Sequence, residues 1–155
     1  IAEFGLKDFD QAIIEYQNLI NFYEKELSNG DHQYRIASIY YKKQNYDQAL
    51  VELQILLENY PKSPWAEETK FKIIEILYAL NRCPEAREQY RHFNLEYSNS
   101  RFKSEMDFVV ASCLEEEGHL QDAYNRFKAL EGQYTYPSIL KMKLVGIEKR
   151  IEKKR

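Results

Sequence analysis

The sequence predicts an all-α protein. Only 5 of the 155 residues are Gly and 4 are Pro, whereas 30% are charged and 13 are Tyr. This composition suits long amphipathic helices better than hairpins and tight turns. The second observation is a period: Ala12, Ala49, Ala86 and Ala123 follow one another at intervals of 37 residues. The length is that of one domain, so we expect a single domain built from repeated helical units.

Three further columns share the 37-residue period. Large side chains stand four, seven and eleven residues after each Ala, and the offsets of four and seven place them on one helix face. The four-residue column is Tyr16, Leu53, Tyr90 and Phe127; the seven-residue column is Leu19, Leu56, Phe93 and Leu130; the eleven-residue column is Tyr23, Tyr60, Tyr97 and Tyr134.

Each Ala lies near the start of the second helix of a unit, and the half-period before it has the pattern of a first helix. Ile36, Ile73 and Val110 form the matching column there. Read in order along the chain, the patterns predict eight helices in antiparallel pairs, at about residues 5–27, 31–44, 46–60, 64–81, 84–98, 101–117, 119–134 and 138–153.

Local signals support these boundaries. Asn29-Gly30 is typical of a helix end, and Ser63-Pro64 predicts an N-cap followed by Pro in the first turn. Pro84 starts a helix with Glu85 in its first turn, where the helix dipole favours a negative charge. Glu117-Gly118 ends another helix.

One helix pair cannot bury its own apolar face, so we expect successive pairs to stack and share a core, as in an α-solenoid. The Ala column then marks the closest crossing of paired helices, where a larger side chain would separate the backbones. Ile74 stands where Ala37 and Ala111 are small, and we expect it to spread its helix pair.

This pattern resembles the tetratricopeptide (TPR) repeat family, whose signature is W-x2-L-G-x2-Y, A-x3-F and P. The resemblance implies a right-handed α-solenoid with an incomplete unit at about 1–27, units at 28–62, 63–99 and 100–136, and a capping helix at 137–155. The matching residues are Gln33, Ile36, Ala37, Tyr40, Ala49, Leu53 and Pro61 in the second unit; Lys70, Ile73, Ile74, Leu77, Ala86, Tyr90 and Ser98 in the third; and Asp107, Val110, Ala111, Leu114, Ala123, Phe127 and Thr135 in the fourth.

The period is longer than the 34 residues of the usual repeat. The junction Tyr60-Pro61-Lys62-Ser63-Pro64-Trp65-Ala66 resembles the Y-P-x-S-x-x-A junction of longer-repeat TPR proteins of bacterial envelopes, namely the outer-membrane-assembly lipoprotein and the Tol-Pal-associated periplasmic protein. We expect Trp65 to pack under Tyr60, with an exposed Trp at a contact rim as the alternative.

The two ends of the chain differ from the middle. The first unit has no room for a leading helix, which favours a trimmed or processed piece. The last predicted helix has one apolar stripe, Leu140, Leu144, Ile147 and Ile151, which is typical of a cap that shields the last repeat. Residues 141–155 have a net charge of +5, which is ordinary at a helix C-terminus.

In TPR proteins the first helices of successive units line a concave groove. The resemblance places nine candidate partner-binding residues there: Tyr34, Ser38, Tyr41, Phe71, Glu75, Tyr78, Phe108, Ser112 and Glu115. Tyr34, Phe71 and Phe108 of this set form an aromatic column with two possible roles. They either pack between neighbouring helices or provide aromatic contacts to a bound segment. Because these positions lack the Lys and Asn of carboxylate-binding chaperone adaptors and several Glu lie nearby, the expected partner is a neutral or basic, apolar protein segment.

The sequence offers no catalytic centre. His32, His92 and His119 lie near helix ends or on polar faces without metal-site spacing, and no Gly-rich loop could hold a phosphate. The net charge of −3 argues against nucleic acid as a partner. We therefore predict a non-enzyme without cofactor, metal or small-molecule substrate.

The predicted function is a protein-protein interaction scaffold. The resemblance to envelope-type repeats implies a bacterial assembly or cell-division factor in the periplasm or cell envelope. Such a factor would be associated with the membrane through an upstream anchor. The alternatives are a cytoplasmic TPR adaptor and a regulatory domain of a larger enzyme.

Cys83 and Cys113 fall at the same edge of the predicted stack. Two isolated cysteines are usually small buried hydrophobes, so we expect free thiols. The alternative, a disulfide, would indicate an oxidising compartment.

Overall fold

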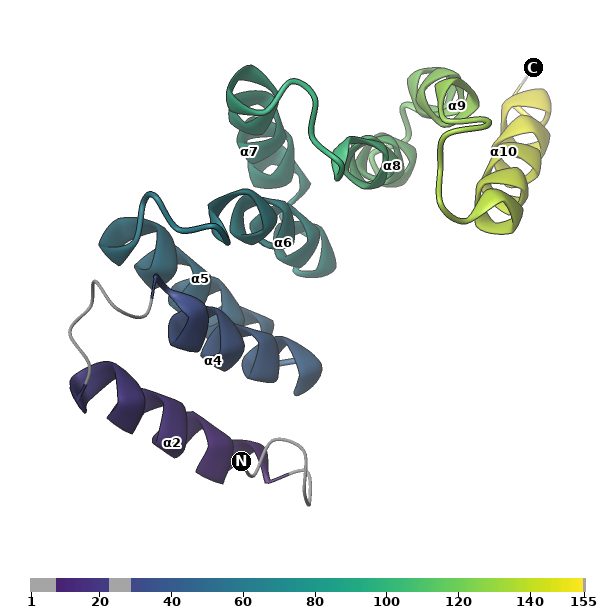
Figure 1. The fold of residues 1–155 in the computed structure, drawn as a ribbon. Coiled ribbons are helices and arrows are strands. Elements are labelled where there is room, and N and C mark those ends of the chain that lie inside the picture. The colour runs from purple at the N-terminus through teal and green to yellow at the C-terminus, as the bar shows by residue number, and fades with distance from the viewer. Residues whose placement is uncertain (1–7, 23–28, 155) are drawn as a thin grey trace. The chain divides into compact units, whose positions relative to one another are not determined.

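The structure is a computed structural model that describes residues 8–22 and 29–154, and over these ranges it consists of helices and turns without a strand (Figure 1). The predicted all-α class of helix pairs is confirmed. Among the described helices, none combines the length and the apolar character needed to cross a bilayer. The helices are α2 (Phe9–Phe22), α4 (Asp31–Lys42), α5 (Tyr46–Asn59), α6 (Ala66–Ala79), α7 (Cys83–Glu96), α8 (Lys103–Glu116), α9 (Leu120–Ala129) and α10 (Pro137–Glu152).

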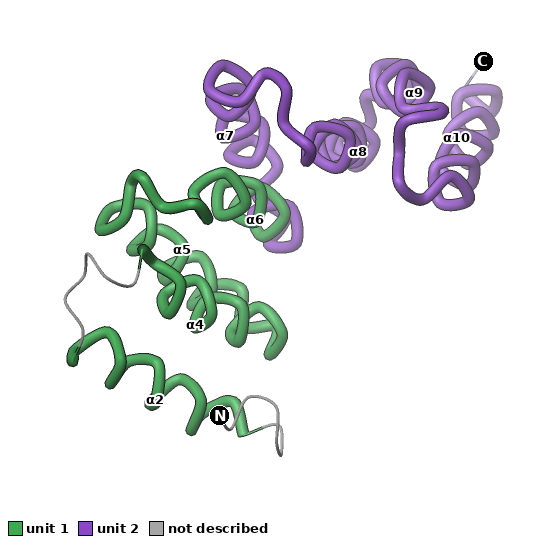
Figure 2. Tube along the Cα trace, in the orientation of Figure 1, with its two compact units in different colours: residues 1–76 green, residues 77–155 purple. Residues whose placement is uncertain are grey.

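The chain divides into two compact units, residues 1–76 and residues 77–155 (Figure 2). Helices α2, α4 and α5 and most of α6 belong to the first unit. The second contains the last three residues of α6 and all of α7 to α10. Each unit has a hydrophobic cluster of its own.

The turn inside each helix pair is the same in three successive pairs. Gln44, Asn81 and Gly118 are 37 residues apart and all have a positive φ, of 58°, 58° and 83°. In each turn the next residue donates its N–H to a carbonyl five residues back, which satisfies an end group of the first helix as in a Schellman motif. These bonds run from Asn45 to Tyr40, from Arg82 to Leu77 and from His119 to Leu114, at 2.8–2.9 Å.

At two junctions between successive helix pairs, a serine hydroxyl caps the turn. The Ser63 hydroxyl accepts the N–H of Trp65 at 3.1 Å, and the Ser100 hydroxyl accepts that of Phe102 at 3.0 Å. The predicted start of a helix at Ser63-Pro64 is therefore wrong by two residues, because Ser63 caps a turn and α6 begins at Ala66. The second junction forms the corresponding bond to its serine hydroxyl although it has no proline at the positions of Pro61 and Pro64, so this turn does not require the prolines.

Two further predicted helices, at 119–134 and 5–27, differ from the described helices at their ends. The helix expected at 119–134 is wrong at its C-terminal end, because α9 stops at Ala129 and Gly132 follows with φ of 81°. The N–H groups of Gln133 and Tyr134 both bond to the Leu130 carbonyl, which closes this turn. The helix expected at 5–27 appears as α2, and its predicted ends, with Tyr23, lie outside the described residues.

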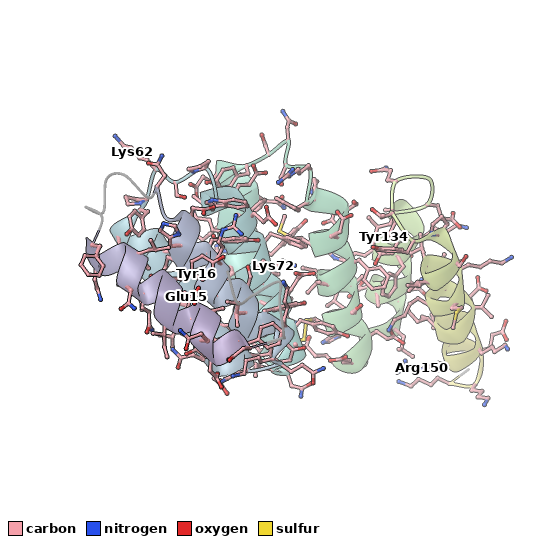
Figure 3. The ribbon with its side chains drawn as sticks, turned by 60° about the horizontal axis from the view of Figure 1, so that its bottom comes forward. Glu15, Tyr16, Lys62, Lys72, Tyr134 and Arg150 are labelled. Atoms are coloured by element: carbon pink, nitrogen blue, oxygen red, sulfur yellow. A yellow bond between two sulfur atoms is a disulfide. The ribbon has the colours of Figure 1, made fainter. Side chains whose placement is uncertain are left out.

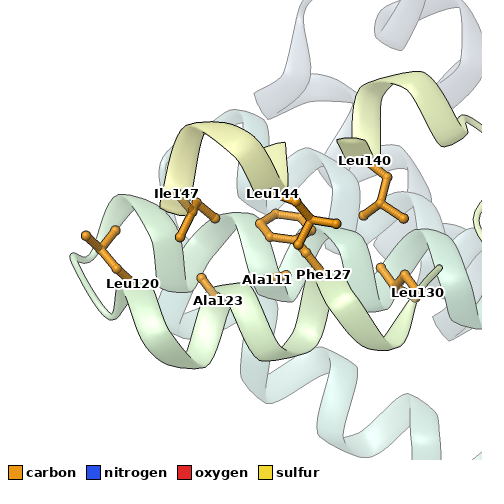
Figure 4. Close-up of a cluster of buried hydrophobic side chains, with 8 residues drawn as sticks. All are labelled: Ala111, Leu120, Ala123, Phe127, Leu130, Leu140, Leu144 and Ile147. Atoms are coloured by element: carbon orange, nitrogen blue, oxygen red, sulfur yellow. The ribbon is translucent and has the colours of Figure 1, made fainter. Parts of the chain in front are cut away.

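The repeat columns form the cores of both units. All four residues of the Ala column have an exposed fraction of 0%. The cluster of the first unit contains Ala12, Ile13 and Tyr16 of α2 with Ile36 and Ile39 of α4. The cluster of the second unit joins α8, α9 and α10 (Figure 4) and consists of Ala111, Leu120, Ala123, Phe127, Leu130, Leu140, Leu144 and Ile147.

The burial of Ala86 leads to a first prediction. Ala86→Leu should lower the free energy of unfolding by about 1–3 kcal/mol, because extra methylenes in a closely packed core force backbone shifts. Urea unfolding followed by circular dichroism measures the change, with Glu85→Leu, at an exposed position of the same helix, as the matched control. An unchanged midpoint for Ala86→Leu would contradict the crossing-point interpretation of the Ala column.

The expectation of free thiols is wrong. Cys83, the first residue of α7, and Cys113, in the last turn of α8, form a disulfide with a Cα–Cα distance of 5.5 Å. Both residues are buried, with exposed fractions of 6% and 0%. Their register placed them at one edge of the stack, and the packing of α7 on α8 brings them within bonding distance.

Candidate partner-binding site

Helix α4 carries three of the predicted groove residues on one face. Tyr34, Ser38 and Tyr41 are spaced at i, i+4 and i+7, so they follow one another along the helix axis. Together they line a cavity of about 270 Å³ in the first unit. Its other walls come from Ala37 and Lys42 of the same helix, Leu53 of α5, and Lys72 and Ile76 of α6.

Tyr34 forms a rigid wall of this cavity. Its ring stacks on the Trp65 indole with centroids 4.3 Å apart and planes 13° from parallel. Its hydroxyl donates to the Glu68 carboxylate at 2.8 Å. Burial raises the pKa of Tyr34, and the bond to Glu68 raises it further, so the phenol stays neutral. Trp65, which the sequence predicts to pack under Tyr60, stacks on this site residue.

Lys72 supplies the charged edge of the cavity and is labelled in Figure 3. Its ammonium binds the Glu75 carboxylate at 2.7 Å and lies 5.0 Å from the centroid of the Tyr41 ring. Burial lowers the pKa of Lys72, but the hydrogen bond and charge of Glu75 outweigh burial and leave the pKa raised. The cavity therefore presents apolar and aromatic walls together with two lysines, Lys42 and the ion-paired Lys72.

The two other candidates of the first unit lie outside the cavity lining. Phe71 is buried, with an exposed fraction of 6%, and Lys72 also lies over its ring at 5.3 Å. Glu75 acts on the cavity through its ion pair with Lys72. Phe71 thus occupies a packing position, and Glu75 holds a cavity residue in place.

In the second unit the aromatic candidates contact side chains of other helices and of the turn between α9 and α10. Phe108 stacks on Tyr134 with centroids 4.5 Å apart and planes 1° from parallel, and its ring meets Phe127 edge-on at 5.1 Å. The Tyr78 hydroxyl donates to Glu116 at 2.8 Å. Burial, and after it the bond to Glu116, raises the pKa of Tyr78 to about 12. Ser112 is buried with an exposed fraction of 1%.

Glu115, the last candidate, joins α8 to α10. Its carboxylate accepts from Lys143 at 2.6 Å and from Arg150, labelled in Figure 3, at 2.8 Å. The Glu115 side chain is only 14% exposed. The structure therefore brings three candidates together around one cavity in the first unit, while Phe108 and Glu115 of the second unit have partners within the fold.

Sequence reasoning missed five cavity residues as site residues: Ala37, Lys42, Leu53, Lys72 and Ile76. Ala37 and Leu53 stand in the repeat pattern, which by itself predicts packing positions rather than site residues. The usable signal was the pair of small side chains at Ala37 and Ser38, because two small neighbours on a groove-facing turn leave volume that large neighbours would fill.

The described residues contain no group of three or more His, Cys, Asp or Glu side chains placed to hold a metal ion. The cavity can bury one large apolar side chain against two tyrosine rings and two aliphatic side chains.

Comparison with known proteins relates this site to one family. Residues 33–63 match the family model described as tetratricopeptide repeat. No curated protein matches the chain. The matched residues contain nearly all of α4, the whole of α5 and the start of the junction to α6, which are the elements that build most of the cavity. The helix pair α4–α5 is therefore similar to a tetratricopeptide repeat, which supports the resemblance found in the sequence.

Proposed function

We propose that the protein is a non-enzymatic scaffold that binds an apolar segment of another protein in the cavity of its first unit. The cavity of about 270 Å³ carries this proposal, because Tyr34, Ser38 and Tyr41, which the TPR resemblance assigns to partner binding, all line it. Tetratricopeptide repeats generally mediate protein-protein interaction, and the matched residues 33–63 contribute most of the walls.

The charges around the cavity indicate the kind of segment. Lys72 is already paired with Glu75, and Glu68 accepts the Tyr34 hydroxyl. An acidic segment would meet the carboxylates of Glu68 and Glu75, whereas the cations of the lining are Lys42 and Lys72, of which Lys72 is paired with Glu75. We therefore propose a segment that is apolar and neutral or basic, with one large side chain in the cavity.

For the biological setting we propose a bacterial envelope assembly or cell-division complex, with the protein in the periplasm or at the membrane through an upstream anchor. The Cys83–Cys113 disulfide supports this setting, because disulfides persist in oxidising compartments and are rare in the cytosol. The junction at residues 60–66, which resembles that of envelope-type repeats, points the same way.

A cavity-filling substitution tests the binding proposal. Ser38→Phe places a ring in the cavity, and its cost to the fold should be small because Ser38 is partly exposed and its hydroxyl donates to the Tyr34 carbonyl of its own helix. Peptides selected on the wild-type protein from a random phage-displayed library should be apolar and neutral or basic. Ser38→Phe should weaken them about tenfold or more, equivalent to at least about 1.4 kcal/mol.

The matched control is Ser98→Phe, which adds the same ring at an exposed position of the second unit. It should leave the affinity of the selected peptides unchanged in fluorescence anisotropy. Enrichment of acidic peptides, or equal affinities for both variants, would show that the cavity is not the binding site.

A further inference from the structure

Helix α10 has a second apolar surface in addition to the one in the core. Leu140, Leu144 and Ile147 pack into the cluster of the second unit (Figure 4). On another face of the helix, Ile139, Met142 and Val145 are exposed by 46%, 75% and 42%. Exposed apolar residues that recur every three positions form a ridge against which another helix can pack.

The same face continues as a basic surface. At about 100° per residue, Lys149 and Lys153 fall within the arc of about 120° that contains the three apolar residues. Both lysines are exposed. We call Ile139, Met142, Val145, Lys149 and Lys153 the α10 outer stripe; it extends for about 20 Å along the helix axis.

The lysines of the outer stripe differ from Lys143 and Arg150 of the same helix. Lys143 and Arg150 are both tied to Glu115. Lys149 and Lys153 form no ion pair within the described part of the chain. Their charge is therefore available to a partner, whereas the charge of Lys143 and Arg150 holds α10 on α8.

We infer that the α10 outer stripe is a second docking surface, which binds an amphipathic helix of a partner protein with an apolar face and an acidic end. Apolar residues occupy the first half of the stripe and lysines the second. A helix with the same division along its axis would match both halves at once, whereas a bilayer surface would favour apolar residues along the whole length of the helix. The methionine at the centre of the ridge adapts readily to an irregular partner surface.

The probe is a fluorescein-labelled helical peptide of about 18 residues, or five turns. Leu residues at helical spacing form its apolar face, and Glu residues fill its last two turns. Anisotropy should detect binding to the whole chain, and the affinity should fall as salt rises. A probe with Lys in place of Glu should bind at least about tenfold more weakly.

Two matched pairs of variants locate the contact. Lys149→Glu with Lys153→Glu should weaken the acidic probe about tenfold or more, while Lys141→Glu with Lys154→Glu, the same charge change at exposed lysines outside the arc, should change it less than about threefold. Met142→Glu should abolish binding, while Leu95→Glu, at an equally exposed apolar residue of α7, should not. Circular dichroism checks the fold of each variant.

Other outcomes would overturn the inference. Equal losses in both double variants would mean diffuse charge attraction, and an absence of binding would remove the surface as a helix site. Tighter binding to vesicles with about 30% phosphatidylserine that Met142→Glu abolishes would assign the stripe to membranes. A dimer that Met142→Glu dissociates would assign it to a second copy. Ser38→Phe should leave the acidic probe unaffected, so this test stands apart from that of the cavity.

Discussion

Phe127→Ala is expected to lower the free energy of unfolding by about 3–5 kcal/mol, the usual cost of removing a fully buried aromatic side chain. Phe127 has an exposed fraction of 0% and lies in the cluster that joins α8, α9 and α10. Its ring meets Phe108 at 5.1 Å, and the ammonium of Lys143 lies 5.9 Å above it. The cavity left by the truncation would therefore loosen three helices at once.

Urea unfolding followed by circular dichroism measures this loss. Arg126→Ala, at the neighbouring exposed position of α9, is the control and should change the free energy by less than about 0.5 kcal/mol. A loss below about 1 kcal/mol for Phe127→Ala would show that the residues four positions after each Ala are not the core of the second unit.

Reduction of the Cys83–Cys113 disulfide is expected to lower the free energy of unfolding by about 3–4 kcal/mol. The two cysteines are 30 residues apart, and a cross-link that closes a loop of this length removes about that much conformational freedom from the unfolded chain. The measurement compares urea unfolding with and without a phosphine reductant, which leaves the sequence unchanged.

The double variant Cys83→Ala with Cys113→Ala is the control, because the reductant should have no effect on its unfolding. Thiol titration of the denatured, unreduced protein gives an independent test, in which no free thiol is expected. Two free thiols would contradict the disulfide and remove its support for an oxidising compartment.

Several features of the fold could be predicted from the sequence because they depend on local pattern. The 37-residue period placed all four alanines of its main column in buried positions. Most predicted helix ends lie within about two residues of the observed ones. The exception among the described helix ends has a local cause, because Gly132 closes a turn directly after α9.

The candidate site was predictable only in part. Helical spacing alone places Tyr34, Ser38 and Tyr41 on one face of α4. It could not show that Lys72 and Ile76 of α6 complete a cavity there, because that depends on how far apart three helices pack. Nor could it decide between packing and binding for the aromatic column, since Phe71 and Phe108 have the same register as Tyr34.

The sequence by itself determined the all-α class, the repeat and the face on which each residue lies, because these follow from the 3.6-residue helical turn and from backbone preferences at caps and turns. Only the tertiary structure decided the bond between Cys83 and Cys113, the stacking of Tyr34 on Trp65 and the capture of Glu115 by two cations of α10. Each of these requires side chains from different helices to meet within a few ångströms. Such distances are set by how side-chain volumes fill the space between helices, which spacing along one chain does not contain.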